Sequence, residues 1–191
     1  MMLETLNQWD ITLFEILNGI HADWADPLMQ ALSSRGLWVP GYMAIAWYLF
    51  RSKGWKDLLL FGIMTGLMVV LADQIASGII KPWAQRFRPC QLEAGLDFVV
   101  HTVEGKCGGK YGFVSSHAAN FFTMATLFSL RIPNKPWPWV FFLLACIAGY
   151  SRIYLGVHYP GDVLVGAMVG LCCASIGWGI YRKMQHIVGL T

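Results

Sequence analysis

The chain has 191 residues, of which 56% are hydrophobic and 13% are charged. Its mean hydropathy of +0.50 is too high for an ordinary soluble domain, so a polytopic membrane protein is expected. The net charge of +3 is spread over separate loops without a basic cluster, so nothing supports nucleic-acid binding, and anionic lipid is the expected partner. No linker, charge run or repeat divides the sequence, so residues 1–191 are taken as a single domain.

The N-terminal part is the least regular. Residues 3–20 are amphipathic, and residues 26–32 begin a short helix that serine and glycine interrupt. This part forms either a short, broken membrane span or a helix in the membrane interface. No Lys or Arg precedes Arg35, so the basic region of a secretory signal peptide is missing and the first spans are expected to direct insertion.

Five apolar runs of membrane-helix length follow in the chain. Each is near the roughly 20 residues that cross a bilayer, and the shorter ones extend into their flanks. Together with the N-terminal part they predict an all-α membrane bundle of about six helices. The runs cover residues 36–50, 58–80, 111–130, 136–151 and 163–181.

One connection, residues 81–110, is much longer than the others and rich in charge and glycine. Long loops in compact domains are usually functional or disordered. Alternating spans place seven Lys and Arg residues on each side of the membrane. Three of those on the side of the long loop, Lys81, Arg88 and Arg152, belong to the polar clusters described next. Without these three, the other side carries more positive charge, which favours an outward-facing loop. If the outward side is oxidising, Cys90 and Cys107 in this loop could form a disulfide.

Two polar clusters flank the long loop. Lys81 ends the second apolar run, and Arg88 follows seven residues later, two turns on if the segment stays helical. Basic residues at the end of a span more often reach for lipid head groups. Ser115, Ser116 and His117 stand at the start of the next span, where a lone histidine is more often structural.

A third cluster follows the fourth apolar run. Arg152 ends that run, His158 lies in the tight turn after it, and Asp162 lies in the first turn of the last helix. The four-residue spacing lets the Asp162 carboxylate accept from one ring nitrogen of His158, which leaves the other nitrogen free to attack. The alternative is an ordinary acidic residue at a helix start beside a histidine in a turn.

The three clusters fall on the same side of the predicted bundle. Ionisable residues at membrane depth are costly and by default indicate function. Three cations and the hydroxyl and N–H groups at a helix start make a cage suited to phosphate. Two histidines complete a reaction, because one can attack phosphorus while the other protonates the leaving oxygen.

These residues resemble the signature of the type 2 phosphatidic acid phosphatases, membrane relatives of the vanadium-dependent haloperoxidases and bacterial acid phosphatases. The signature is KxxxxxxRP, then PSGH, then SRxxxxxHxxxD. The first and third parts match in full, whereas the second has Val in place of Pro and Ser in place of Gly. The matching positions are Lys81, Arg88 and Pro89, then Ser115 and His117, then Ser151, Arg152, His158 and Asp162, and the two departures are Val114 and Ser116.

The resemblance implies a role for each residue. His158 would be the nucleophile that becomes phosphohistidine, Asp162 would orient it, and His117 would protonate the leaving group and then activate water. The phosphate oxygens would be held by Lys81, Arg88, Arg152, Ser115 and Ser116. The glycine that Ser116 replaces presents its backbone N–H to phosphate in the family.

We therefore expect an integral membrane enzyme that hydrolyses a lipid phosphate or diphosphate without a metal or other cofactor, at the outer face of a bacterial inner membrane. Undecaprenyl diphosphate ranks first as substrate, on its frequency among small family members, ahead of phosphatidylglycerol phosphate, phosphatidic acid and lipid A. An anion transporter and an inactive lipid-phosphate-binding relative are the alternatives of another class. Nothing in the sequence indicates an oligomeric state.

Four further polar residues have no assigned chemistry. Asp73 lies about two turns before Lys81 and is expected to make a structural contact with a neighbouring span. His21, His101 and His186 have no partner at a meaningful spacing and are expected on the surface.

Overall fold

The computed structural model describes residues 2–190. These residues form helices and loops, with no β-structure beyond one isolated bridge between Phe87 and Tyr111, so the predicted all-α class is confirmed. The α-helices are α1 (Met2–Gly19), α2 (Asp26–Ser33), α3 (Val39–Asp73), α4 (Lys81–Ala84), α5 (Ser116–Arg131), α6 (Trp137–Tyr154) and α7 (Pro160–Ile187). A π-helix (Gln74–Ile80) joins α3 to α4, and short 3-10 helices cover Gly36–Trp38 and Leu92–Ala94.

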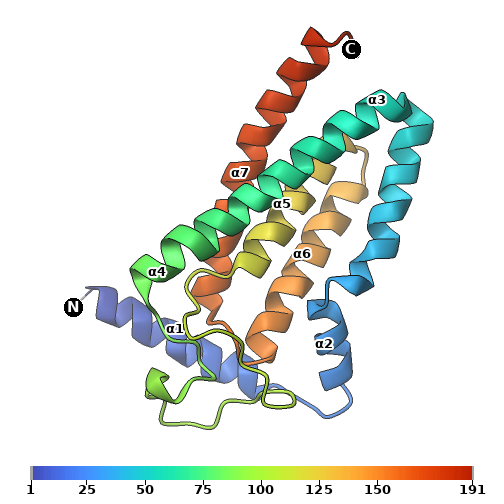
Figure 1. Cartoon of the computed structure of the whole chain (residues 1–191). Coiled ribbons are helices and arrows are strands. Elements are labelled where there is room, and N and C mark those ends of the chain that lie inside the picture. The colour runs from blue at the N-terminus through green and yellow to red at the C-terminus, as the bar shows by residue number, and fades with distance from the viewer. Residues whose placement is uncertain (1, 191) are drawn as a thin grey trace.

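Helix α3 consists of two arms that meet at Gly54. Gly54 has φ +82° and ψ 174°, a conformation open to glycine but strained for other residues, and the chain reverses there (Figure 1). The predicted runs 36–50 and 58–80 fall on the two arms. Within the described residues, two helical stretches are both long and apolar enough to cross a membrane on their own, Gly36–Ala84 and Pro160–Ile187.

Helix α5 lies in the middle of the bundle, packed against α7, α6 and α3 (Figure 1). Its closest approach is to α7, where Gly166 and Gly170 leave no room for a side chain. A Cβ atom at Gly166 would overlap the carbonyl of Ser115, and one at Gly170 would overlap that of Ala119. Small residues permit such contact between membrane helices, and here they hold the start of α5 against the start of α7.

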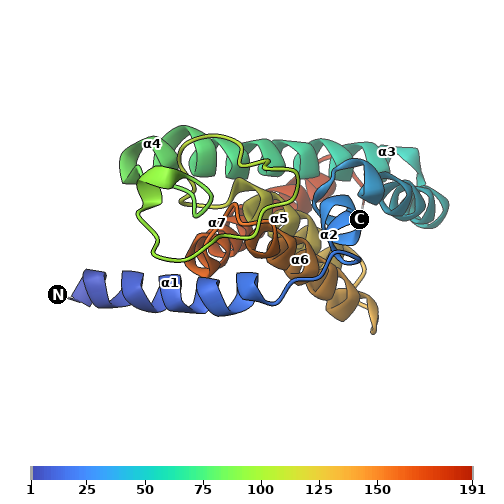
Figure 2. The ribbon, with the colours of Figure 1, turned by 90° about the horizontal axis from the view of Figure 1, so that it is seen from below.

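Helix α1 lies across one end of the bundle (Figures 1 and 2). It buries Phe14 completely against Ile153 and Tyr159, while most of its other side chains stay exposed. This course across the end of the bundle fits the interfacial helix, one of the two arrangements that the sequence allowed for the N-terminal part.

The long loop lies at the same end of the bundle as α1 and α2 (Figure 1). Cys90 and Cys107 form a disulfide, with their Cα atoms 5.7 Å apart, as their shared loop predicted. The Cys90 N–H donates to the carbonyl of Gly156 at 3.1 Å, which ties this loop to the turn between α6 and α7.

The expectation that His101 is a surface residue is wrong. Its ring is half-buried, with Nε2 3.0 Å from the Asp26 carboxylate and the ring stacked on His21 at 4.0 Å. Its backbone N–H donates to Asn18 at 2.8 Å. These partners lie far away in the sequence, where no local spacing reveals them. His186 is exposed, as expected.

Candidate active site

The turn between α6 and α7 presents a buried histidine–aspartate pair. His158 is 2% exposed and Asp162 is fully buried, and His158 Nδ1 lies 3.2 Å from Asp162 Oδ2. The same carboxylate oxygen accepts from the backbone N–H of Tyr159 at 3.0 Å. Because Asp162 can only accept, Nδ1 carries the proton, and Nε2 keeps its lone pair.

The imidazole of His158 is neutral at physiological pH. Burial lowers its pKa to about 4, although the hydrogen bond from Nδ1 to Asp162 acts in the opposite direction. A neutral ring with a free Nε2 is the form that can attack an electrophile.

Two arginines come to the same site from different elements. Arg88, in the long loop, is 8% exposed, and its Nη1 lies 3.5 Å from His158 Nε2 and donates to the Val157 carbonyl at 3.3 Å. Arg152, at the end of α6, donates to the hydroxyl of Ser33 on α2. The Nε atoms of both arginines are buried without a hydrogen-bond partner among the described residues. Buried donors of this kind suit an anionic ligand.

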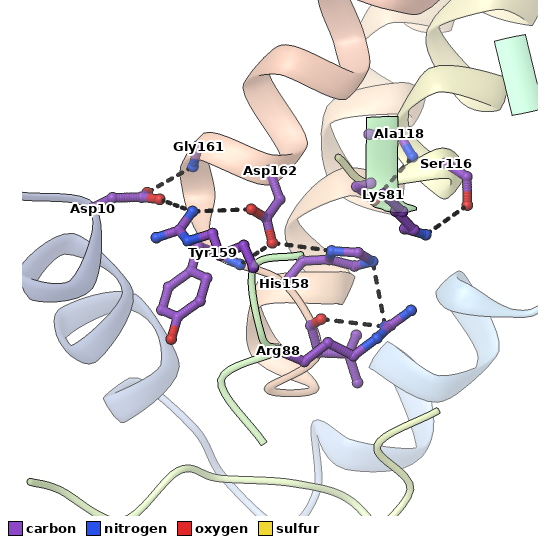
Figure 3. Close-up of polar contacts among 12 residues, drawn as sticks. Asp10, Lys81, Arg88, Ser116, Ala118, His158, Tyr159, Gly161 and Asp162 are labelled. Atoms are coloured by element: carbon purple, nitrogen blue, oxygen red, sulfur yellow. Dashed lines mark hydrogen bonds and ion pairs between the residues drawn. The ribbon is translucent and has the colours of Figure 1, made fainter. Parts of the chain in front are cut away.

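A cavity of about 500 Å³ brings most of the predicted site together. Its wall includes five of the eight predicted residues: Arg88, Ser116, His117, Arg152 and His158. A sixth, Lys81, lies beside the wall with its Nζ 3.5 Å from Ser116 Oγ (Figure 3). The Nε2 of His117 is buried and has no hydrogen-bond partner within residues 2–190.

Ser115 is placed differently from the prediction. Its hydroxyl accepts from the N–H of Ala118 at 3.3 Å and so caps α5, and its own N–H donates to the Asp162 carbonyl at 2.9 Å. It is fully buried and does not line the cavity, and its hydroxyl fixes the start of α5.

Behind Asp162, Arg86 and Asp10 form a hydrogen-bonded pair that the sequence did not predict (Figure 3). Arg86 Nη1 donates to Asp162 Oδ1 at 3.0 Å and to Asp10 Oδ2 at 2.6 Å, and its guanidinium lies 3.8 Å above the ring centre of Tyr159. Asp10 also accepts from the N–H of Gly161 at 2.7 Å. The only sequence signal was the density of basic residues near Arg88, which does not single out Arg86.

Asp73 makes the expected contact with a neighbouring span. The side-chain amide of Asn120 on α5 donates to Asp73 Oδ1 at 3.2 Å, and both residues line the cavity. Within the described part of the chain, no three His, Cys, Asp or Glu side chains lie close enough together to hold a metal ion.

A histidine–aspartate pair facing buried cations, at one end of a helix bundle, matches the site that the three sequence clusters predicted. The model of the PAP2 superfamily matches residues 58–185, and the chain belongs to that superfamily. The resemblance drawn from the three sequence clusters is therefore confirmed.

Two curated relatives are lipid A 4'-phosphatases. The protein from Bacteroides thetaiotaomicron is 37% identical over 94% of this chain and 79% of its own length, and that from Porphyromonas gingivalis is 34% identical over 94% and 75%. LpxE of Aquifex aeolicus has a similar solved structure, with a TM-score of 0.65 and 26% identity over 88% of this chain and 94% of that one.

These relatives do not support the first-ranked substrate. The undecaprenyl-diphosphatase of Sulfolobus acidocaldarius is 27% identical over 85% of this chain and 73% of its own length, well below the lipid A 4'-phosphatases. The chain is a membrane lipid phosphatase, and the preference for undecaprenyl diphosphate, which rested on frequency alone, is unsupported.

Proposed function

We propose that the chain removes a phosphate group from lipid A or a closely related phosphorylated glycolipid, through a phosphohistidine at His158. The 37% and 34% identity to two lipid A 4'-phosphatases supports the substrate class. The observation that carries the mechanism is the sharing of one cavity by His158, His117, Arg88 and Arg152.

The first step transfers the phosphoryl group to the enzyme. His158 Nε2 forms a bond to phosphorus while the bond from phosphorus to the lipid oxygen breaks, and His117 gives a proton to that oxygen. Asp162 stabilises the positive charge that develops on the His158 ring. Arg88, whose Nη1 already lies 3.5 Å from His158 Nε2, holds the phosphoryl oxygens together with Arg152 and Lys81.

The second step releases phosphate. His117, now neutral, accepts a proton from water as the water attacks phosphorus and the nitrogen–phosphorus bond breaks. Inorganic phosphate leaves, and both histidines return to their starting protonation states. The dephosphorylated lipid retains its hydroxyl and stays in the membrane.

We further propose that this site faces outward from a bacterial inner membrane. The disulfide between Cys90 and Cys107 lies in the loop that supplies Arg88, and disulfides persist in oxidising compartments such as the periplasm. Labelling of introduced cysteines in intact cells and in opened cells tests this orientation.

Phosphoenzyme trapping tests the reaction. Purified protein is mixed with lipid A carrying labelled phosphate, and the acid-labile label on protein and the released phosphate are followed. His158→Ala is expected to abolish both, whereas His117→Ala slows expulsion of the sugar leaving group. His186→Ala, an exposed histidine at the far end of α7, serves as the matched control. Label that persists in His158→Ala would reverse the roles of the two histidines.

A further inference from the structure

Part of the active-site cavity carries hydrogen-bonding groups that the proposed reaction does not use. Asp73 lines it from the end of α3, Gln74 from the start of the π-helix that follows, and Asn120 from α5. Asp73 lies about two helical turns before Lys81, and Asn120 lies about one turn after His117. These groups are therefore deeper in the bundle than the cations and histidines.

The backbone changes from α-helix to π-helix directly after Asp73. The π-helix covers Gln74–Ile80, and π-helical turns occur frequently at functional sites. Both Asp73 and Gln74 reach the cavity wall. A carboxylate so far inside an apolar span is costly unless it has a partner.

Asp73 and Asn120 have hydrogen-bond acceptor positions that the described residues do not fill. Among the described residues, the two side chains share one hydrogen bond, the 3.2 Å contact from the Asn120 amide to Asp73 Oδ1. Asn120 Oδ1 is buried without a partner among the described residues, and no Lys, Arg or His nitrogen of residues 2–190 lies within 4.0 Å of the Asp73 carboxylate. Both groups can accept further O–H or N–H donors.

The order of groups along the cavity indicates what they meet. The cations hold phosphate at the end of the bundle, and His117 stands where the leaving oxygen departs. Asp73 and Asn120 lie deeper along their helices than Lys81 and His117, and Tyr42, Phe121 and Met124 of the same cavity also line an adjoining apolar cavity of about 380 Å³. The part of the substrate beside Asp73 is thus the head group, between the phosphate and the lipid chains.

We propose that Asp73 and Asn120 form a subsite that accepts hydroxyl and amide donors of a sugar leaving group. This inference rests on the proposed function and deepens it. The sugar ring of an acylated glucosamine offers O–H and N–H donors at this position. A diphosphate lipid would instead place its second, negatively charged phosphate beside the Asp73 carboxylate, and these two negative charges repel each other.

Substrate selectivity tests the subsite. For the parent and for Asp73→Asn, kcat/KM is measured in one detergent with 4'-phosphorylated lipid A and with an isoprenyl diphosphate. Removing the carboxylate weakens the acceptor for the sugar and removes the repulsion of the diphosphate. The ratio of the two kcat/KM values is expected to fall by about tenfold or more, since a hydrogen bond to a charged group corresponds to about this factor. Asn120→Ala is expected to lower the ratio in the same direction.

Asp23→Asn makes the same chemical change at an exposed carboxylate outside the cavity and is expected to leave the ratio unchanged. If Asp73→Asn and Asn120→Ala both reduce hydrolysis of the two lipids in equal proportion, or change neither, the subsite is refuted. If the parent protein does not hydrolyse lipid A at all, the proposed function fails instead. Circular dichroism of each variant in detergent separates loss of folding from loss of selectivity.

Discussion

Asp162 is the residue on which the geometry of the site depends. It is fully buried, and its two oxygens accept from His158, from the Tyr159 backbone and from Arg86. A buried carboxylate is costly unless it is paired and hydrogen-bonded, and Asp162 meets both conditions. The result is a rigid acceptor that holds one tautomer of His158 with Nε2 toward the cavity.

The titration of His158 follows from this burial. Its pKa is lowered to about 4, chiefly by burial, so the ring stays neutral as pH falls from 7 and gains a proton only near pH 4. We expect an NMR titration of the ring, assigned with His158→Gln, to have its midpoint near 4. Asp162→Asn removes the group that favours the protonated ring and should lower the midpoint further. A midpoint at the ordinary histidine value of 6.5 would contradict the buried geometry.

Ser116 occupies the position where related sequences carry glycine, and its hydroxyl lies 3.5 Å from Lys81 Nζ. We expect Ser116→Gly to lower kcat/KM by less than about a hundredfold, because one hydrogen bond to a charged group is worth at most about 1.5–3 kcal/mol and backbone donors remain. Ser116→Val keeps the bulk without the hydroxyl and should cost at least as much. A glycine variant faster than the parent would identify the hydroxyl as an obstruction. Steady-state phosphate release measures both variants.

At the scale of elements, helix α1 supports the turn that carries His158. Asp10 on α1 accepts from Arg86 and from the Gly161 N–H at the start of α7, and Phe14 packs edge-on against Tyr159 at 5.3 Å. A Cβ atom at position 161 would lie 2.7 Å from Asp10 Oδ2, so a side chain there would displace the Asp10 carboxylate. Asp10 therefore positions Asp162 through Arg86 without reaching the cavity.

We expect Asp10→Asn to lower kcat about tenfold and to leave KM nearly unchanged, because the amide keeps the Gly161 contact but loses the charge-assisted bond to Arg86. The matched control is Glu15→Gln, an exposed carboxylate one to two turns further along α1. Kinetics on lipid A and the His158 titration are measured together. An unchanged kcat, or a rise in KM alone, would show that Asp10 serves only the packing of α1.

The sequence predicted the helices that carry the motifs, but it did not predict the residues that hold the motif side chains in place. Lys81, Arg88, His117 and His158 follow a fixed order on the ends of apolar runs, so their meeting at one end of a bundle follows from alternating spans. Asp10 meets Arg86 across 76 residues, and no periodicity marks such a pair. The cap that Ser115 makes was not predicted for a related reason, because a hydroxyl at a helix start can face an anion or cap the helix and the sequence does not distinguish these.

In the whole molecule, buried charged side chains lie toward the ends of the bundle and apolar side chains fill the middle. The long loop and α1 lie at one end (Figure 1). The candidate site lies in the cavity that holds His158 and Arg88. Away from the cavity, Asp57 beside the bend of α3 forms a second buried cluster, pairing with Arg131 and accepting from Tyr181 at 2.7 Å. This cluster ties α3, α5 and α7 together, which keeps the helices that carry the site in a fixed relation.

Charge neutralisation by side chains from separate segments leads to a prediction for the whole enzyme. Arg88 and Arg152 line one cavity and Lys81 lies beside its wall, where the three can offset the charge of phosphate without a metal ion. Phosphate release is therefore expected to persist in EDTA and to be blocked by vanadate, which adopts the five-coordinate geometry of the transition state. Arg152→Ala should weaken vanadate inhibition more than Arg182→Ala, a control near the opposite end of α7. An absolute need for a divalent ion would contradict a cage built from side chains alone.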